Sequence, residues 1–169
     1  MTAPIRILGL DPGLARMGWG VIAVSGSRLT HVAHGVITTR TADGLGLRLL
    51  ALHRALAAII AEQKPAAIAV EQAFVAKDPS AALKIGHARA IALLAGAQAG
   101  LEIAEYAPNH IKKSVVGVGH AQKEQVQAMV RRLIPTSRVE QADAADALAC
   151  AIAHAHLAAT RARMIAALA

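Results

Sequence analysis

The hydrophobic pattern predicts a run of strands followed by an alternation of helices and strands. Short apolar runs bounded by turn residues predict five strands. These are expected at Ile5–Leu10, Gly18–Val24, Leu29–Thr38, Ala66–Glu71 and Leu101–Tyr106. Apolar residues at helical spacing predict the helices that follow the third strand. These are expected at Leu45–Gln63, at Ser80–Ala99, within residues 108–121, at Gln122–Leu133, and from near Gln141 into the 160s.

This order of elements predicts an α/β protein. An antiparallel meander followed by βα alternation gives a mixed sheet with helices on both faces. A chain of 169 residues can bury one sizeable core. We therefore expect a single domain over residues 1–169, with an ordered core at about 3–160 and a basic C-terminal tail.

Composition narrows the class of protein. The 55% apolar content argues against a disordered chain, and Cys150 as the only cysteine fits a reducing compartment. The longest apolar stretch, Ala90–Leu101, is shorter than the ~20 residues that cross a bilayer. The first residues lack the pattern of a signal peptide. We expect a cytoplasmic protein without a membrane partner.

The charge balance points to a polyanionic partner. Lys and Arg total 18 against 11 Asp and Glu, which gives a net charge of +7. Such an excess suits nucleic acid or an anionic membrane surface. A small domain also needs some net charge to remain soluble, so the balance alone leaves the partner open.

Four of the acidic residues stand apart from the ordinary surface charges. Asp11 and Glu71 end the first and fourth predicted strands, and Asp143 and Asp146 lie among Ala, Leu and Ile in QADAADALACAIA. A buried carboxylate costs free energy unless something neutralises it. No Lys or Arg lies within four residues of Glu71, Asp143 or Asp146 in the sequence.

These four carboxylates can meet at one edge of the sheet. The first and fourth strands would be parallel neighbours, so their carboxyl ends open at the same edge. The spacing of Asp143 and Asp146 places both on one helix face. Oxygen ligands of this kind suit Mg²⁺ or Mn²⁺, and two such ions could promote hydrolysis of a phosphodiester. Turn formation by Asp11 and helix capping by Asp143 are the ordinary alternatives.

Five segments, in this order, resemble one nuclease family. They are GLDPG at 9–13, VEQAF at 70–74, ALKIGHARA at 82–90, KKSVVGVGHAQKEQV at 112–126 and QADAADALA at 141–149. With them the chain resembles the RuvC family of Holliday junction resolvases through nearly its whole length. The resemblance implies the ribonuclease H-like α/β fold, a five-stranded mixed sheet flanked by helices on both faces, and a homodimer.

The resemblance also implies an activity. It implies a Mg²⁺-dependent endodeoxyribonuclease of recombination and repair that nicks two strands of like polarity at a four-way DNA junction. The nicks leave 5′-phosphate and 3′-hydroxyl ends. The family's catalytic and metal-binding acids carry over onto Asp11, Glu71, Asp143 and Asp146. Two Mg²⁺ per subunit are expected, with Mn²⁺ able to substitute, and the implied partners are the branch-migration proteins RuvA and RuvB.

Several basic residues are candidates for DNA contact. Six Lys or Arg against two Glu fall between residues 109 and 140. Lys123 and Arg131 lie on the polar side of a predicted helix, as phosphate contacts or as a plain solvated face. Lys112 and Lys123 match family lysines associated with DNA contact and catalysis. Further contacts are expected at Lys77, Lys84 and Lys113.

Phe74 is the only Phe of the chain and lies in a predicted loop after Glu71. The resemblance implies that it stacks on a base at the junction centre, and burial in the core is the alternative. From Ala90 onward the helix at Ser80–Ala99 is apolar on nearly every side. It is therefore a core helix or one shared with a second subunit.

Three other functions compete with the resolvase. A ribonuclease H that cleaves RNA–DNA hybrids is the nearest. An actin-like ATPase would share the strand, Asp-Pro-Gly turn and second strand, but would need a Ser/Thr-rich turn and a second domain. In a non-catalytic DNA-binding protein, four isolated carboxylates would weaken polyanion binding. We expect His154 and His156 to be structural in all of these cases.

Overall fold

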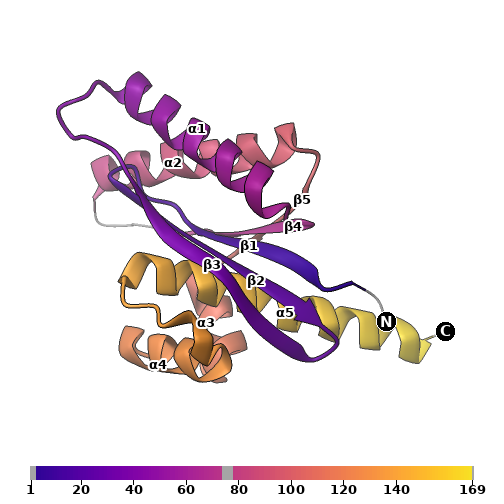
Figure 1. Cartoon of the computed structure of the whole chain (residues 1–169). Helices are drawn as coiled ribbons and strands as arrows, with labels where there is room; N and C mark the ends of the chain where they lie inside the picture. The colour runs from indigo at the N-terminus through magenta and orange to yellow at the C-terminus, as the bar shows by residue number, and fades with distance from the viewer. Residues whose placement is uncertain (1–2, 74–77, 169) are drawn as a thin grey trace.

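Five strands form one mixed sheet in the order β3-β2-β1-β4-β5, in a computed structural model that describes residues 3–73 and 78–168 (Figure 1). The strands are β1 (Ile5–Asp11), β2 (Arg16–Ser25), β3 (Arg28–Thr38), β4 (Ala67–Glu71) and β5 (Glu102–Tyr106). β1, β2 and β3 pair antiparallel, whereas β4 runs parallel to both β1 and β5. The predicted mixed sheet, including the parallel pairing of the first and fourth strands, is confirmed.

Five α-helices accompany the sheet in the described residues. They are α1 (Leu45–Gln63), α2 (Pro79–Gln98), α3 (Pro108–Val116), α4 (Lys123–Leu133) and α5 (Ala142–Leu168), with a short 3₁₀ helix at Pro135–Ser137. Local signals fix some of their ends. The Asp78 carboxylate accepts hydrogen bonds from the backbone N–H groups of Ser80 and Ala81, with Pro79 in the first turn of α2. The predicted bounds differ from the observed ones by at most about two residues.

The helices cover the two faces of the sheet separately (Figure 1). Successive residues of a strand point to opposite faces, so β1 serves two cores. Leu8 and Leu10 pack with residues of α1 and α2, including Leu52. Ile7 packs on the other side, where Leu148 of α5 is fully buried. Both faces of the central strand are therefore apolar, as its continuous apolar sequence predicts.

Helix α5 lies unusually close to the sheet because glycines face it. A Cβ on Gly9 of β1 would overlap the carbonyl oxygen of Ala147. A Cβ on Gly18 of β2 would overlap the carbonyl oxygen of Asp143 in the same way. Gly18 is paired with Asp11 across the β1–β2 ladder. The missing side chains thus bring the start of α5 next to the carboxyl end of β1.

The last helix continues past the expected end of the core. α5 extends to Leu168, so the residues expected to form a basic tail after about 160 lie in the same helix. Within residues 3–73 and 78–168, no helix has both the length and the apolar character that a bilayer crossing demands.

The glycine contact predicts a specific loss of stability. Gly9→Ala should lower the free energy of unfolding by about 1–3 kcal/mol, because the new methyl group overlaps the backbone of α5. Urea denaturation of the purified protein measures this change. Gly86→Ala in α2 is the matched control, since its Cβ enters open space and should be neutral or add up to about 1 kcal/mol. Equal stability of the two variants would contradict the close packing of α5.

Candidate active site

Four carboxylates come from three elements at one edge of the sheet. Asp11 is the last residue of β1 and Glu71 the last residue of β4, directly after the paired residues Leu10 and Val70. Asp143 and Asp146 lie in the first two turns of α5, which packs against β1 and β2. The structure therefore places the four predicted acids in one region, as the order of strands requires.

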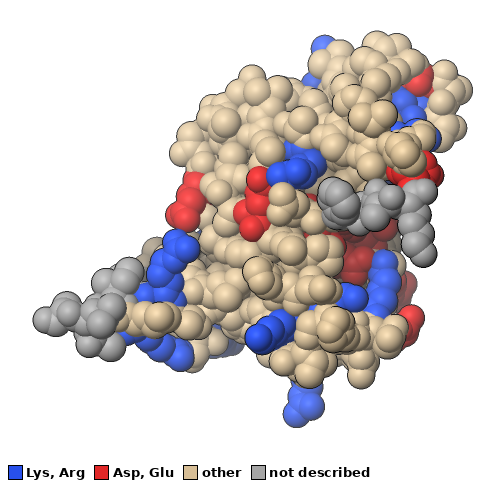
Figure 2. Space-filling model, turned by 180° about the vertical axis from the view of Figure 1, so that it is seen from behind, with Lys and Arg blue, Asp and Glu red and all other residues tan. Residues whose placement is uncertain are grey.

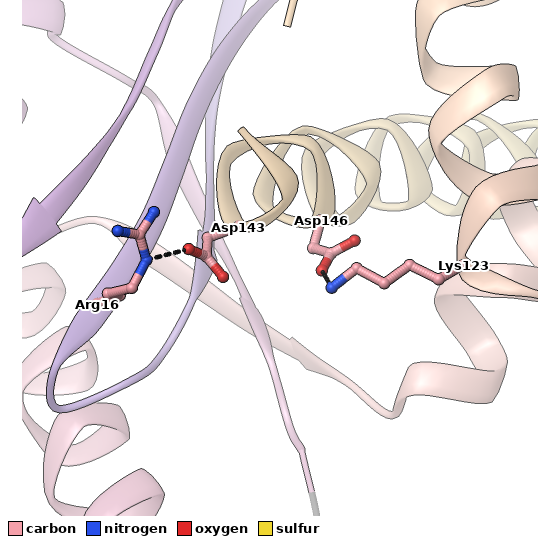
Figure 3. Close-up of polar contacts among 4 residues, drawn as sticks. All are labelled: Arg16, Lys123, Asp143 and Asp146. Carbon is pink, nitrogen blue, oxygen red and sulfur yellow. Dashed lines mark hydrogen bonds and ion pairs between the residues drawn. The ribbon is translucent and has the colours of Figure 1, made fainter. Parts of the chain in front are cut away.

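The two carboxylates of α5 each form an ion pair (Figure 3). Arg16 Nε lies 2.7 Å from Asp143 Oδ2, and Lys123 Nζ lies 2.7 Å from Asp146 Oδ2. Arg16 is the first residue of β2 and Lys123 the first residue of α4. The positive partners, which are absent from the neighbouring sequence, thus come from distant parts of the chain.

The carboxylates at the strand ends are destabilised as anions. Burial raises the pKa of Asp11 to about 7, and repulsion from Asp146 and Asp143 adds to the effect. Burial likewise raises the pKa of Glu71 to about 7, with repulsion from Asp11 and Asp146. Lys123 acts in the opposite direction on both groups. A cation that binds between Asp11 and Glu71 would stabilise the charged forms of both carboxylates, which burial and mutual repulsion disfavour.

Asp146 is both partly buried, like Asp11 and Glu71, and ion-paired, like Asp143. Burial raises its pKa above the ordinary value, although its hydrogen bond to Lys123 opposes the shift. The same contact raises the pKa of Lys123, so the ammonium group stays charged at neutral pH. The site accordingly combines two ion-paired acids with two acids whose charged forms are disfavoured by burial.

A cavity of about 250 Å³ opens at these residues. Its lining combines two of the acids, two lysines and an apolar floor: Glu71, Asp146, Lys112, Lys123, Pro108, Ile111, Val126 and Ala149. On the face shown in Figure 2, recessed acidic side chains have basic side chains at their border. Such an arrangement accepts a phosphate at the rim and a divalent cation among the acids.

The donor set fits a hard divalent cation, although the side chains do not yet converge on one point. Among the described residues, no three His, Cys, Asp or Glu side chains stand close enough together to hold a metal ion. Asp143 and Asp146 are turned instead toward Arg16 and Lys123. Carboxylate oxygens are the ligands that Mg²⁺ and Mn²⁺ prefer. Burial, together with repulsion from Asp146 and Asp143, raises the pKa of Asp11, and a bound cation would offset both effects.

The remaining predicted site residues are distributed unevenly. Lys112 and Lys123 line the cavity, but Lys113 faces a second cavity of about 490 Å³ between β5, α3 and α5. Consecutive residues of a helix are 100° apart, so α3 directs its two lysines to different places. Lys84 on α2 and Arg131 on α4 are exposed and are not among the lining residues of the first cavity.

Two predicted contacts, Phe74 and Lys77, lie outside the described residues. The two histidines of α5 make structural contacts. His154 is buried, and its Nδ1 shares a hydrogen bond of 2.8 Å with the Tyr106 hydroxyl. His156 Nδ1 donates to the Ser114 carbonyl oxygen at 3.0 Å. Both contacts tie α5 to neighbouring elements.

Sequence reasoning missed Arg16. It is exposed and is the first residue of an otherwise apolar strand, so no local pattern marks it. The available signal was topological: Asp11 is paired with Gly18, two residues after Arg16, and the start of α5 had been expected at the same edge. The contact between Gly18 and α5, which brings Arg16 close to Asp143, is not visible in the sequence.

Known proteins resemble this chain over nearly its whole length. A family model described as crossover junction endodeoxyribonuclease RuvC matches residues 7–154. The protein of that name from Parvibaculum lavamentivorans is 56% identical over 168 residues, which is 99% of this chain and 96% of the relative. The one from Paracoccus denitrificans is 59% identical and covers 90% of this chain and 92% of its own length.

Solved structures agree with these relatives. The structure described as T. thermophilus RuvC in complex with Holliday junction substrate superposes with a TM-score of 0.87 at 32% identity, covering 92% of this chain and 96% of that one. The yeast mitochondrial Holliday junction resolvase has a TM-score of 0.67 at 13% identity, covering 95% of this chain and 84% of that one, and so shares the fold.

The raised pKa of Asp11 predicts that the free energy of unfolding depends on pH. Between the ordinary pKa of 3.8 and the folded value of about 7, the folded chain binds the Asp11 proton and the unfolded chain does not. The contribution of Asp11 to the free energy of unfolding therefore falls as the pH rises through this window. In EDTA, Asp11→Asn should be more stable than the wild type by about 1–3 kcal/mol at pH ~8, and by less at pH ~5.

Urea denaturation at the two pH values measures this difference. Glu62→Gln, on the exposed surface of α1, is the control and should change stability equally little at both. A constant difference between Asp11→Asn and the wild type at the two pH values would show that the Asp11 carboxyl does not titrate in this window.

Proposed function

The chain belongs to the RuvC family of crossover junction endodeoxyribonucleases, and we propose that it resolves Holliday junctions by paired nicks in strands of like polarity. It is a nuclease that hydrolyses DNA phosphodiester bonds, and its family is metal-dependent. This membership favours the nuclease over an actin-like ATPase and over a non-catalytic DNA-binding protein. The observation that carries the proposal is the group of four acids at one edge of the sheet, two of which line a cavity together with Lys112 and Lys123.

Asp11, Glu71, Asp143 and Asp146 are the proposed ligands of two Mg²⁺ per subunit, with Mn²⁺ able to substitute. A bound divalent cation supplies Lewis acidity and charge neutralisation at the scissile phosphate. The carboxylates fix where the cation binds, because β1, β4 and α5 hold them rigidly. Without a cation, the same acids would repel the DNA backbone.

Lys112 and Lys123 are the proposed phosphate contacts inside the cavity. Lys112 lines the cavity beside Glu71 and Asp146, where its positive charge would attract the DNA backbone. Lys123 is held by Asp146 at 2.7 Å, which keeps its ammonium group beside the reacting phosphate. Hydrolysis leaves the 5′-phosphate on one end and the 3′-hydroxyl on the other.

Further DNA contacts are proposed away from the cavity. Lys84 and Arg131 are exposed, and Lys113 faces the second cavity, so each would reach phosphates of the junction arms. The stacking of Phe74 at the junction centre follows from the resemblance alone, and Lys77 stays a predicted DNA contact.

A homodimer is proposed through α2. Leu83 and Leu94 are 65% and 49% exposed, and their spacing of eleven residues puts them on one helix face with His87 and Ala90. The His87 Nδ1 atom is buried and, within the described residues, has no hydrogen-bond partner. A two-fold dimer would present two equivalent sites to a substrate of approximate two-fold symmetry.

We further propose that residues 1–169 act as a single nuclease domain in the cytoplasm. RuvA and RuvB remain the partners that the resemblance implies.

A nicking assay on a synthetic four-way junction tests the activity. Asp146→Asn should lower the rate of cleavage by about 100-fold or more, because a cation ligand is lost, while junction binding persists. The wild type should require Mg²⁺ or Mn²⁺ and be inactive in EDTA. Linear duplex and RNA–DNA hybrid are the substrate controls, and faster cleavage of the hybrid would favour a ribonuclease H.

Asp43→Asn provides the matched control variant, since Asp43 lies in the surface loop before α1, where it pairs with Arg40. It should cleave at the wild-type rate. Loss of junction binding in Asp146→Asn, with an unchanged melting temperature, would contradict a purely catalytic role of this acid.

The proposed dimer face is tested by sedimentation. Leu94→Lys should shift the protein toward monomer, because a charge would be buried in an apolar contact. Ile5→Lys is the control, since Ile5 is 57% exposed on β1, away from α2, and should leave the oligomeric state unchanged. A wild type that sediments as a monomer at all concentrations would exclude this interface.

A further inference from the structure

Arg16 makes a contact that the proposed reaction does not use. Its Nε lies 2.7 Å from Asp143 Oδ2, and the two side chains are 54% and 30% exposed (Figure 3). The contact joins residues that are 127 positions apart in the chain. It occupies an oxygen of a proposed metal ligand.

The backbone places Arg16 firmly at this position. Residues two apart in a strand point to the same face, so Arg16 and Gly18 both face α5. A Cβ on Gly18 would overlap the backbone of Asp143, which fixes the distance between β2 and the start of α5. Pairing of Arg16 with Thr38 of β3 holds the start of the strand. The guanidinium therefore reaches Asp143 because of the sheet geometry.

A guanidinium and a divalent cation compete for the same carboxylate. An oxygen that accepts a charge-assisted hydrogen bond at 2.7 Å offers less charge to a cation, and the guanidinium repels that cation directly. Arg does not deprotonate in proteins, so the competition can end only when the side chain turns away. An exposed fraction of 54% leaves room for this movement.

The ion pair of Asp146 differs from that of Asp143 in where its cation lies. Its partner, Lys123, lines the cavity itself and stays beside the site whichever acid it contacts. Arg16 is not among the lining residues of the cavity and approaches from the β2 side. Once released, its planar fork suits a phosphate better than an ammonium group would.

We propose that Arg16 is a positioning residue that exchanges partners: it holds Asp143 in the metal-free protein and turns to a DNA phosphate when a divalent cation takes Asp143. This inference rests on the proposed function, because it assumes that Asp143 is a metal ligand. The exchange links metal loading to DNA binding on the β2 side of the site.

Titration of the DNA-free protein with Mn²⁺, followed by electron paramagnetic resonance, tests the first half. Arg16→Met should bind Mn²⁺ about 2- to 5-fold more tightly than the wild type, because the competing cation is gone. Arg40→Met is the matched control, since Arg40 pairs with Asp43 on the surface and its change should leave Mn²⁺ affinity unaltered. Unchanged or weaker Mn²⁺ binding by Arg16→Met overturns the proposal.

Fluorescence anisotropy with a synthetic four-way junction tests the second half. In Ca²⁺, Arg16→Met should bind the junction about 2- to 5-fold more weakly, with a salt dependence smaller by about one charge. In EDTA it should bind like the wild type, since Arg16 is then held by Asp143. An equal loss in Ca²⁺ and EDTA would make Arg16 an ordinary phosphate contact and overturn the exchange.

Two further variants keep the outcomes distinct. Arg16→Gln repeats both measurements if Arg16→Met does not fold, with the same expected shifts. Asp143→Asn tests the premise, because it should weaken Mn²⁺ binding whatever Arg16 does. If Asp143→Asn leaves Mn²⁺ binding intact, the proposed metal ligands are wrong. If it weakens binding and Arg16→Met has no effect, only the exchange is wrong.

Discussion

The close contact between α5 and the sheet is the constraint on which the site depends. Helix and strand backbones approach this far only because Gly9 and Gly18 carry no side chain. The contact brings Asp143 to the strand that is paired with Asp11, and it brings Arg16 within reach of the same helix. The packing of the Ala-rich helix α5 on the glycines of β1 and β2 therefore determines where the charged residues of the site lie.

The four acids of the site differ in how well the fold stabilises their negative charges. Burial and mutual repulsion raise the pKa of Asp11 and of Glu71 to about 7, whereas Lys123 and Arg16 satisfy the two acids of α5. Keeping Asp11 and Glu71 ionised inside the fold therefore lowers the free energy of unfolding. The proposed divalent cation would offset this cost, so that its affinity would depend on how the whole fold holds these acids.

The sequence predicted those features that depend on neighbouring residues or on strand order. The positions of Asp11 and Glu71 follow from strands that end in a carboxylate, and their proximity follows from parallel pairing. The ion pair of Arg16 could not be predicted in this way, because its partner is 127 positions away and Arg16 itself breaks no local pattern. The division of Lys112 and Lys113 between two cavities depends on the rotation of α3, which its apolar positions define only loosely.

The order of the acids along the chain has a consequence for synthesis. Asp11 in β1 is synthesised well before Asp143 and Asp146, which lie in α5. The strands can pair while the ribosome is still at work, but the site exists only after α5 has packed against them. A chain that ends before α5 therefore lacks two of the four acids and cannot assemble the site.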